Sequence, residues 1–206
     1  TAAPAPLAPP LVRLRAAAAE RRWASAYCLA YAGASTAAFT ELARDAPEWL
    51  EIVGVEMPGK GQLADAAWPD EPAEVADAAR DPAEGTMMAL LASRIAADAA
   101  GGALVLVGWS MGAMLAAELA LHLEELGAHP QLVHVAGRMA PGSFVGAGGA
   151  ITEAEVERYL LVPDELRTGS AYREWLLPTL MADLRADARA ERRVVELIAR
   201  AAAGGR

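Results

Sequence analysis

The chain has 206 residues, of which 54% are hydrophobic and 22% charged, which is enough apolar material for one compact domain. Only 5% are aromatic, so Ala, Val, Leu and Met must build the core, and the abundance of Ala argues against an all-β sandwich. The formal net charge of −9 argues against a protein that binds nucleic acid or coats an anionic membrane.

The cysteine count and the N-terminal composition favour a cytoplasmic protein. Cys28 is the only cysteine, so neither an intrachain disulfide nor a thiolate metal cluster is expected. Residues 1–10 are mostly Ala and Pro without a basic segment, which is typical of an extension and not of a secretory signal. No uncharged apolar run is long enough to span a bilayer, and no histidine pair has metal-ligand spacing, so we expect neither a membrane partner nor a metal.

The first part of the chain predicts two strands separated by a helix. Val12–Trp23 is rich in Ala and Arg and favours a lead-in helix with a solvated basic face. The apolar run Ser25–Tyr31 predicts the first strand, and Thr36 is a plausible N-cap for a helix through Arg44. A second strand is expected at Glu51–Met57.

After a long segment without periodicity, predicted helices and strands alternate again. Gln62–Glu84 predicts a surface loop, and Thr86–Ala100 places apolar residues on one helical stripe. Ala103–Val107 predicts a strand, Ser110–Leu126 a helix and Gln131–Ala136 a fourth strand. Strands alternating with helices over such spans predict an α/β fold, with a parallel sheet covered by helices on both faces.

The last third of the chain predicts helices and no further strand. Thr152 and Glu155 form a capping box that opens a helix through Leu161. Further helices are expected at Ala171–Asp187 and Glu191–Ala203.

Residues 108–112 (GWSMG) match G-x-S-x-G between a buried strand and a long helix. Small residues on both sides of Ser110 suit a nucleophile elbow, whose strained turn lifts the serine oxygen above the sheet. The alternative is an ordinary strand-to-helix turn in which Ser110 only caps the helix. An oxyanion formed at this serine needs two backbone donors, for which Met111 and Ala32 are the candidates.

Five segments resemble, in order, the type II thioesterases of polyketide and nonribosomal peptide synthesis, over Ser25 to Asp187. They are CLAYAGAS, VEMPGKGQ, GWSMGAMLAAELA, VAGRMAP and LLPTLMADLRAD. These α/β-hydrolases remove aberrant acyl groups from the phosphopantetheine arm of carrier proteins, beneath a helical lid over an acyl chamber. The resemblance implies a role in natural-product, including antibiotic, biosynthesis, with no cofactor beyond the carrier's own arm.

The resemblance assigns roles to individual residues. Ser110 is expected to be the nucleophile that forms an acyl-enzyme, and Ala32 and Met111 to line the oxyanion hole. The expected substrate-binding side chains are Tyr31, Trp109, Trp175, Leu176 and Leu180. The implied division is an N-terminal extension (1–24), an α/β core (25–150), a lid (151–190) and a terminal helix (191–206). The lid stripe around Leu180 fits core packing as well as an acyl chamber.

The partner implied by the resemblance is an acyl or peptidyl carrier protein. Carrier proteins are generally acidic, so an acidic chain needs a local basic patch to dock one. We expect that patch to include Arg21, Arg22 or Arg138.

The sequence departs from the family after the lid. In the family, two further strands deliver an Asp and then a His, whereas this sequence passes into RRVVELIARAAAGGR. The segment that carries them is either deleted or missing from the sequence as given. If the sequence is complete, we expect a truncated sheet whose edge strand, Gln131–Ala136, is open to a second copy or a companion chain. Asp183 and Asp187 on the lid could approach the pocket, but the favoured interpretation is that they are solvated helix charges.

None of the three histidines is placed to act as the general base. His122 lies twelve residues along the helix from Ser110, about 18 Å, and His129 lies farther away. His134 is inside a predicted strand, where a histidine satisfied by a neighbour is expected. Three functions therefore stay open: hydrolysis of carrier-bound thioesters, binding of an acyl chain or synthase partner by a catalytically depleted fold, and non-hydrolytic cyclisation.

Overall fold

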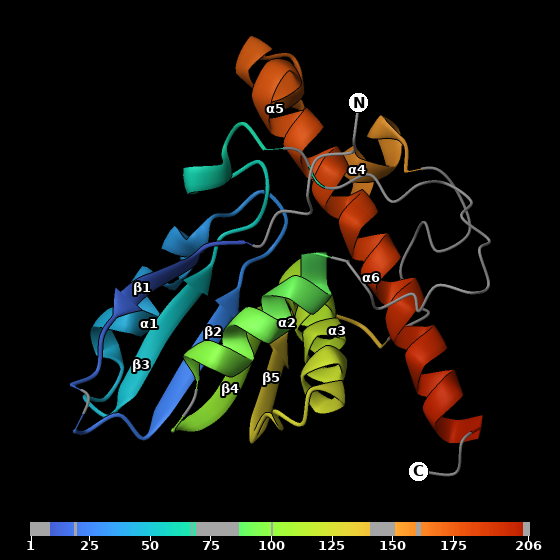
Figure 1. Ribbon diagram of the computed structural model, residues 1–206. Coiled ribbons are helices and arrows are strands. Elements are labelled where there is room, and N and C mark those ends of the chain that lie inside the picture. Colours follow the sequence, from blue (N-terminus) through green and yellow to red (C-terminus); the bar gives the residue numbers. More distant parts are fainter. Residues whose placement is uncertain are drawn as a thin grey trace, which may run out of the picture.

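Figure 1 shows the computed structural model of the chain. It describes residues 9–203, apart from 19, 67, 69–86, 100, 141–150 and 160–161. Most of the loop expected at Gln62–Glu84 lies outside the described residues, and its described start holds the last two residues of the short 3-10 helix η2 (Gly61–Leu63).

The sheet has five strands in the order β1-β3-β2-β4-β5. Strands β2 (Ala24–Leu29), β3 (Leu50–Val55), β4 (Ala103–Trp109) and β5 (Leu132–Ala136) run parallel to their neighbours among these four. The predicted α/β class and the four parallel strands are thus confirmed. Because parallel strands end at the same edge, the loops after β2, β4 and β5 lie together there.

The prediction of a helix at Val12–Trp23 is wrong, because residues Leu11–Arg15 form strand β1, which pairs antiparallel with β3. Composition favoured a helix, but alternation and strand pairing override propensity here. Leu14 packs on the core, while the Arg13 guanidinium lies 2.6 Å from Asp98 and 3.2 Å from Glu51. The segment assigned to an extension therefore contributes a strand to the sheet.

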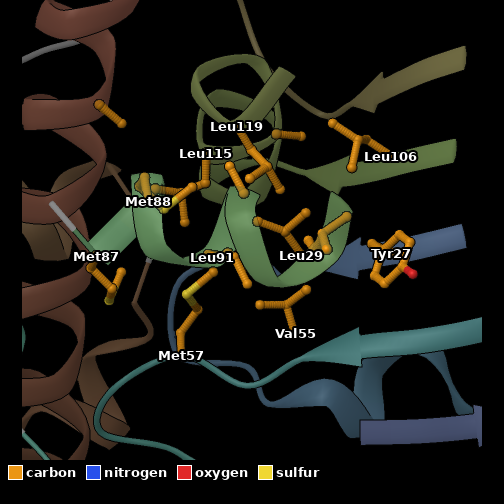
Figure 2. Close-up of a cluster of buried hydrophobic side chains, with 14 of the residues drawn as sticks. Tyr27, Leu29, Val55, Met57, Met87, Met88, Leu91, Leu106, Leu115 and Leu119 are labelled. Atoms are coloured by element: carbon orange, nitrogen blue, oxygen red, sulfur yellow. The ribbon is translucent and has the colours of Figure 1, made fainter. Parts of the chain in front are cut away.

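Helices cover both faces of the sheet (Figure 1). Helices α2 (Met87–Asp98) and α3 (Met111–Glu125) pack on one face, and η1 (Thr36–Phe39) and α1 (Thr40–Asp45) on the other. The strands alternate accordingly: Leu29 joins the cluster under α2 and α3 shown in Figure 2, whereas Cys28 joins the one under α1. Burial raises the pKa of the Cys28 thiol to about 12 and keeps it neutral.

The C-terminal third is helical, as predicted. It comprises α4 (Glu153–Tyr159), α5 (Asp164–Arg167), the π-helical turn η3 (Tyr172–Leu176) and α6 (Leu177–Ala203). The capping box is confirmed, because the Thr152 N–H donates to the Glu155 carboxylate at 2.9 Å and the Glu155 N–H donates to the Thr152 hydroxyl at 3.3 Å.

The two helices expected at Ala171–Asp187 and Glu191–Ala203 are one continuous helix over most of their length. No glycine or proline interrupts the sequence between them, so the helix continues. Helix α6 runs beside α3 (Figure 1), where Ala190 and Val194 join the core of the sheet domain. Its first half, with Leu180 and Leu184, packs in a second cluster with α4.

Strand β5 forms an open edge of the described sheet. It pairs with β4, and among the described residues no strand lies beyond it. Apolar side chains on both of its faces are exposed: Leu132 to 54%, Val133 to 37% and Val135 to 51%. No helix within the described ranges is both long and apolar enough to cross a membrane.

Candidate active site

Ser110 lies in a sharply bent turn between β4 and α3. Its φ of 54° and ψ of −113° make it the one non-glycine residue with positive φ in the described part of the chain. The Ser110 N–H donates to the Ala136 carbonyl at 2.8 Å, and its side chain makes no hydrogen bond that caps α3. The capping alternative is therefore wrong, and the strained backbone has the geometry of a nucleophile elbow.

Steric contacts explain both glycines of the motif. A methyl group on Gly108 would overlap the backbone of Gly112 and Ala113, and one on Gly112 would overlap the Leu29 carbonyl oxygen. The first turn of α3 thus packs backbone-to-backbone against the end of β2. This close approach brings the turn after β2 beside the elbow.

The turn after β2 spans Tyr31 to Ala34 and is closed by a 3.0 Å hydrogen bond from the Ala34 N–H to the Tyr31 carbonyl. Gly33, with φ of 83°, occupies the position where such a turn needs a left-handed residue. The Gly33 N–H donates to Asp183 at 2.7 Å. No described residue accepts a hydrogen bond from the Ala32 N–H, so that amide is available to a ligand.

The second expected donor, the Met111 N–H, lies at the first helical position of α3. Amides at this position have no partner within the helix, and they lie at the positive end of its dipole. The two candidate donors therefore come from two elements that the approach of Gly112 to β2 holds together.

Two aromatic side chains flank the candidate donors. Tyr31 precedes Ala32 and Trp109 precedes Ser110, and their rings pack edge to face with centroids 4.9 Å apart. Both rings are partly exposed, at 39% and 47%. The two packed rings therefore form an apolar surface next to Ser110, and this surface is partly exposed to solvent.

The apolar stripe expected on the lid divides into two parts. Leu180 is buried and packs over Gly33, as Leu176 does in part, whereas Trp175 is 75% exposed. A helical stripe that starts in a π-helical turn changes its angular spacing, so the first residues point away from the rest. The structure brings Leu180 to the site and leaves Trp175 outside it.

The expectation that Asp183 and Asp187 are solvated is wrong, since both are fully buried. Asp183 accepts hydrogen bonds from Lys60 Nζ at 2.6 Å and from Trp68 Nε1 at 2.9 Å, in addition to Gly33. The sequence did not predict these partners, because Lys60 lies 123 residues from Asp183 and the residues around Lys60 indicate only a turn.

Asp187 lies one helical turn farther on and pairs with Arg138, whose second amino group contacts Glu191 at 2.8 Å. Burial, with the neighbouring carboxylates of Glu191 and Asp183, raises the pKa of Asp187 to about 6, although Arg138 opposes this shift. One carboxylate oxygen of Asp187, Oδ1, has no hydrogen-bond partner among the described residues.

The basic residues expected to dock a carrier form no exposed patch around Ser110, although Arg138 follows β5 close to the elbow. Arg138 is buried in its ion pairs. Arg21 and Arg22 precede β2 and contact Glu48 and Glu51, so they lie at the opposite end of the sheet from Ser110.

All three histidines are described, and none lies at the carboxyl edge of the sheet. His122 is buried on α3, where Glu118 raises its pKa. His129 contacts Glu124 at 2.6 Å beyond that helix, and His134 lies opposite Val107 on the exposed strand β5. Within the described segments, no group of three His, Cys, Asp or Glu side chains is arranged to hold a metal ion.

Comparisons with known proteins show the family of the chain. The family model of the thioesterase domain matches residues 26–203. The chain therefore belongs to the thioesterase domain family. Among curated proteins, none matches it significantly.

Solved structures of related fold are thioesterases of biosynthetic pathways. The RedJ thioesterase of the prodiginine pathway in Streptomyces coelicolor is 28% identical, with 92% of this chain and 69% of that chain covered and a TM-score of 0.60. YbtT, a type II thioesterase of the yersiniabactin pathway, is 22% identical, with 87% and 70% covered and a TM-score of 0.62. The fold and the resemblance to type II thioesterases are confirmed, and the chain spans about 70% of the length of these neighbours.

Replacement of Gly112 by Ala tests the packing of the elbow. The added methyl group would force α3 away from the end of β2, so we expect the free energy of unfolding to fall by about 2–3 kcal/mol in urea denaturation. Gly169→Ala is the matched control, because its methyl group meets an ordinary contact of 3.4 Å and its φ is not positive. Equal stability of the two variants would contradict the close approach.

The buried Asp187 gives a prediction for pH dependence. Its pKa is raised in the folded state from 3.8 to about 6, so between these values the folded chain holds a proton that the unfolded chain releases. Stability relative to Asp187→Asn should therefore fall by about 2–3 kcal/mol as pH rises from 4 to 7. Parallel urea titrations of the two proteins measure the difference, and a constant difference, or one that grows with pH, would refute the expectation.

Proposed function

We propose that the chain accepts acyl groups from carrier-protein phosphopantetheine on Ser110, as the first step of thioester hydrolysis in natural-product biosynthesis. The observation that carries this proposal is the backbone of Ser110, which is held at φ 54° with its side chain uncommitted to helix capping. Strain of this kind is retained where the surrounding structure enforces it, and it clusters at reactive residues. Membership of the thioesterase domain family supports the same chemistry.

The proposed reaction starts with attack of Ser110 Oγ on the thioester carbonyl carbon. The oxyanion of the tetrahedral intermediate is stabilised by the N–H groups of Ala32 and Met111. The C–S bond then breaks, and the pantetheine sulfur leaves with the electron pair. A thiolate, whose conjugate acid has a pKa of about 8.5, leaves without prior protonation, so this step needs no general acid. Water then hydrolyses the serine ester and releases the acyl group as a carboxylate.

Proton transfer is the step of this reaction for which the described part of the chain offers no evident base. Attack by Ser110 and by water each requires removal of a proton, and none of the three histidines lies at the carboxyl edge. In subtilisin, loss of the catalytic histidine alone lowers kcat by about 10⁶. Acylation of Ser110 is therefore expected to be slow unless a base is supplied from outside these residues.

The placement of the histidines also favours a second candidate function. A fold that keeps the elbow and the lid but lacks a base can bind an acyl or polyketide chain, or a synthase partner, without hydrolysing a thioester. The same arrangement would suit cyclisation, in which a nucleophile of the bound chain replaces water. In all three cases Tyr31 and Trp109 supply the apolar contact next to Ser110, and Leu176 and Leu180 line the lid side.

A fluorophosphonate probe distinguishes functions that use Ser110 as a nucleophile from binding alone. We expect the wild-type chain to be labelled slowly at Ser110, because no histidine lies beside it. Ser110→Ala should lose all labelling, and Ser93→Ala should label at the wild-type rate, because Ser93 is an exposed residue of α2. Intact mass spectrometry gives the readout, and release of thiol from a short acyl-pantetheine thioester reports turnover. Labelling that survives in Ser110→Ala would reject the assignment, and saturable acyl binding without labelling would favour the binding function.

We also propose that β5 associates with a second copy or a companion chain. No described strand pairs with its outer edge, and Leu132, Val133 and Val135 are exposed on it. A partner strand there would cover these side chains and extend the sheet next to the elbow.

Sedimentation velocity tests this association. We expect concentration-dependent dimers or higher species of the purified chain, and loss of them in Val135→Lys, because a charge on an edge strand opposes pairing. Trp23→Lys is the control, since it removes a 75% exposed apolar side chain at the other end of the sheet. A chain that stays monomeric at its highest attainable concentration would contradict self-association.

A further inference from the structure

Asp183 is a buried charge that the proposed reaction does not use. Its side chain is fully buried and accepts three hydrogen bonds, from Gly33 N–H at 2.7 Å, Lys60 Nζ at 2.6 Å and Trp68 Nε1 at 2.9 Å. The three donors come from different segments of the chain. One carboxylate therefore joins the turn after β2, the segment after β3 and helix α6.

The two carboxylate oxygens have different partners. Oδ1 accepts from Lys60 and Trp68, which neutralise and orient the buried charge, and Oδ2 accepts from the backbone of Gly33. Hydrogen bonds to an ionised carboxylate are about twice as strong as neutral ones. The turn that contains Ala32 is therefore held by a fixed, charge-assisted bond from α6.

Packing on the same face of α6 supports this bond. Leu180 lies three residues before Asp183, and a methyl group on Gly33 would come within 2.9 Å of its Cδ2 atom. Ala32 itself packs against the apolar cluster that contains Leu180. Leu180 and Asp183, from one face of α6, thus both contact the turn: Leu180 packs on it, and Asp183 accepts a hydrogen bond from it.

A simple attachment of α6 does not account for the contact with Gly33. The Lys60–Asp183 ion pair alone would hold the helix with one oxygen. Farther along, Arg138 pairs with Asp187, and Arg193 donates to Glu118 on α3. Helix α6 is thus held at several points besides the bond to Gly33, and this bond is the one that reaches the turn after β2.

We propose that Asp183 is a positioning residue for the oxyanion hole, which holds Gly33 so that the Ala32 N–H is directed to the same point as the Met111 N–H. This inference rests on the proposed function of Ser110. It also selects between the amides of the turn: Gly33 N–H is committed to Asp183 and Ala34 N–H closes the turn, so Ala32 N–H serves the substrate.

The test replaces Asp183 with Asn, which keeps the shape of the side chain. An amide group cannot accept from both sides, so its NH2 must face either Gly33 N–H or the donors Lys60 and Trp68. We expect the amide hydrogen exchange of Gly33, followed by NMR, to accelerate at least about tenfold. Fluorophosphonate labelling of Ser110 should slow by about the same factor.

Glu118→Gln is the matched control. It also removes a fully buried carboxylate that holds α6, through Arg193, but its contacts do not reach the turn after β2. Exchange at Gly33 and labelling at Ser110 should stay within about twofold of wild type in this variant, even where its Tm falls as far as that of Asp183→Asn. Equal effects of the two variants on Gly33 exchange would overturn the proposal, because Asp183 would then act only by anchoring the helix.

The readouts separate this inference from the proposed function. If the wild-type chain does not label, the nucleophile assignment fails, and Gly33 exchange alone decides whether Asp183 positions the turn. If labelling of Asp183→Asn equals wild type while Gly33 exchange accelerates, the positioning role is overturned and Ser110 stands. Should Asp183→Asn not fold, the wild-type Gly33 amide decides, because a bond to Asp183 requires slow exchange and a scalar coupling to the carboxylate carbon.

Discussion

The contact of the α3 backbone with the end of β2 is the constraint on which the rest of the site depends. Gly112 lies so close to the Leu29 carbonyl that no side chain fits between them. Sheet pairing fixes β2 and β4 in register, and this contact fixes the turns at their carboxyl ends. The strained backbone of Ser110 persists because both of its ends are held by that packing. The conformation of Ser110 is thus a product of backbone sterics.

Helix α6 adds electrostatic constraints from the side opposite the sheet. It carries Asp183, Asp187 and Glu191 at intervals of four residues, all buried against cations that lie after β3 and β5 in the chain. Buried ion pairs contribute little net stability, because desolvation offsets their attraction. They do select one position of the helix, since a shifted helix would leave a charge unpaired. The polar interface therefore specifies where α6 lies more than how strongly it is held.

The sequence predicted those features that depend on short segments of chain. The order of strands and helices follows from periodicity, the elbow from GWSMG and the capping box from Thr152 and Glu155. Strand β1 was missed because its pairing with β3, about forty residues away, overrides its composition. The burial of Asp183 was missed for the same reason, because nothing near it in the sequence indicates that Lys60 and Trp68 surround it.

The continuity of α6 limits how the site can admit a large substrate. At 1.5 Å per residue, its 27 residues form a rod about 40 Å long. One end covers the turn at Gly33, and Ala190 and Val194 farther along are embedded beside α3. A tilt of α6 that opened one end would expose the buried residues at the other end, so the helix is expected to stay in place. The short helices α4 and α5 and the π-helical turn η3 are separate elements, so they can shift without displacing α6 as a whole.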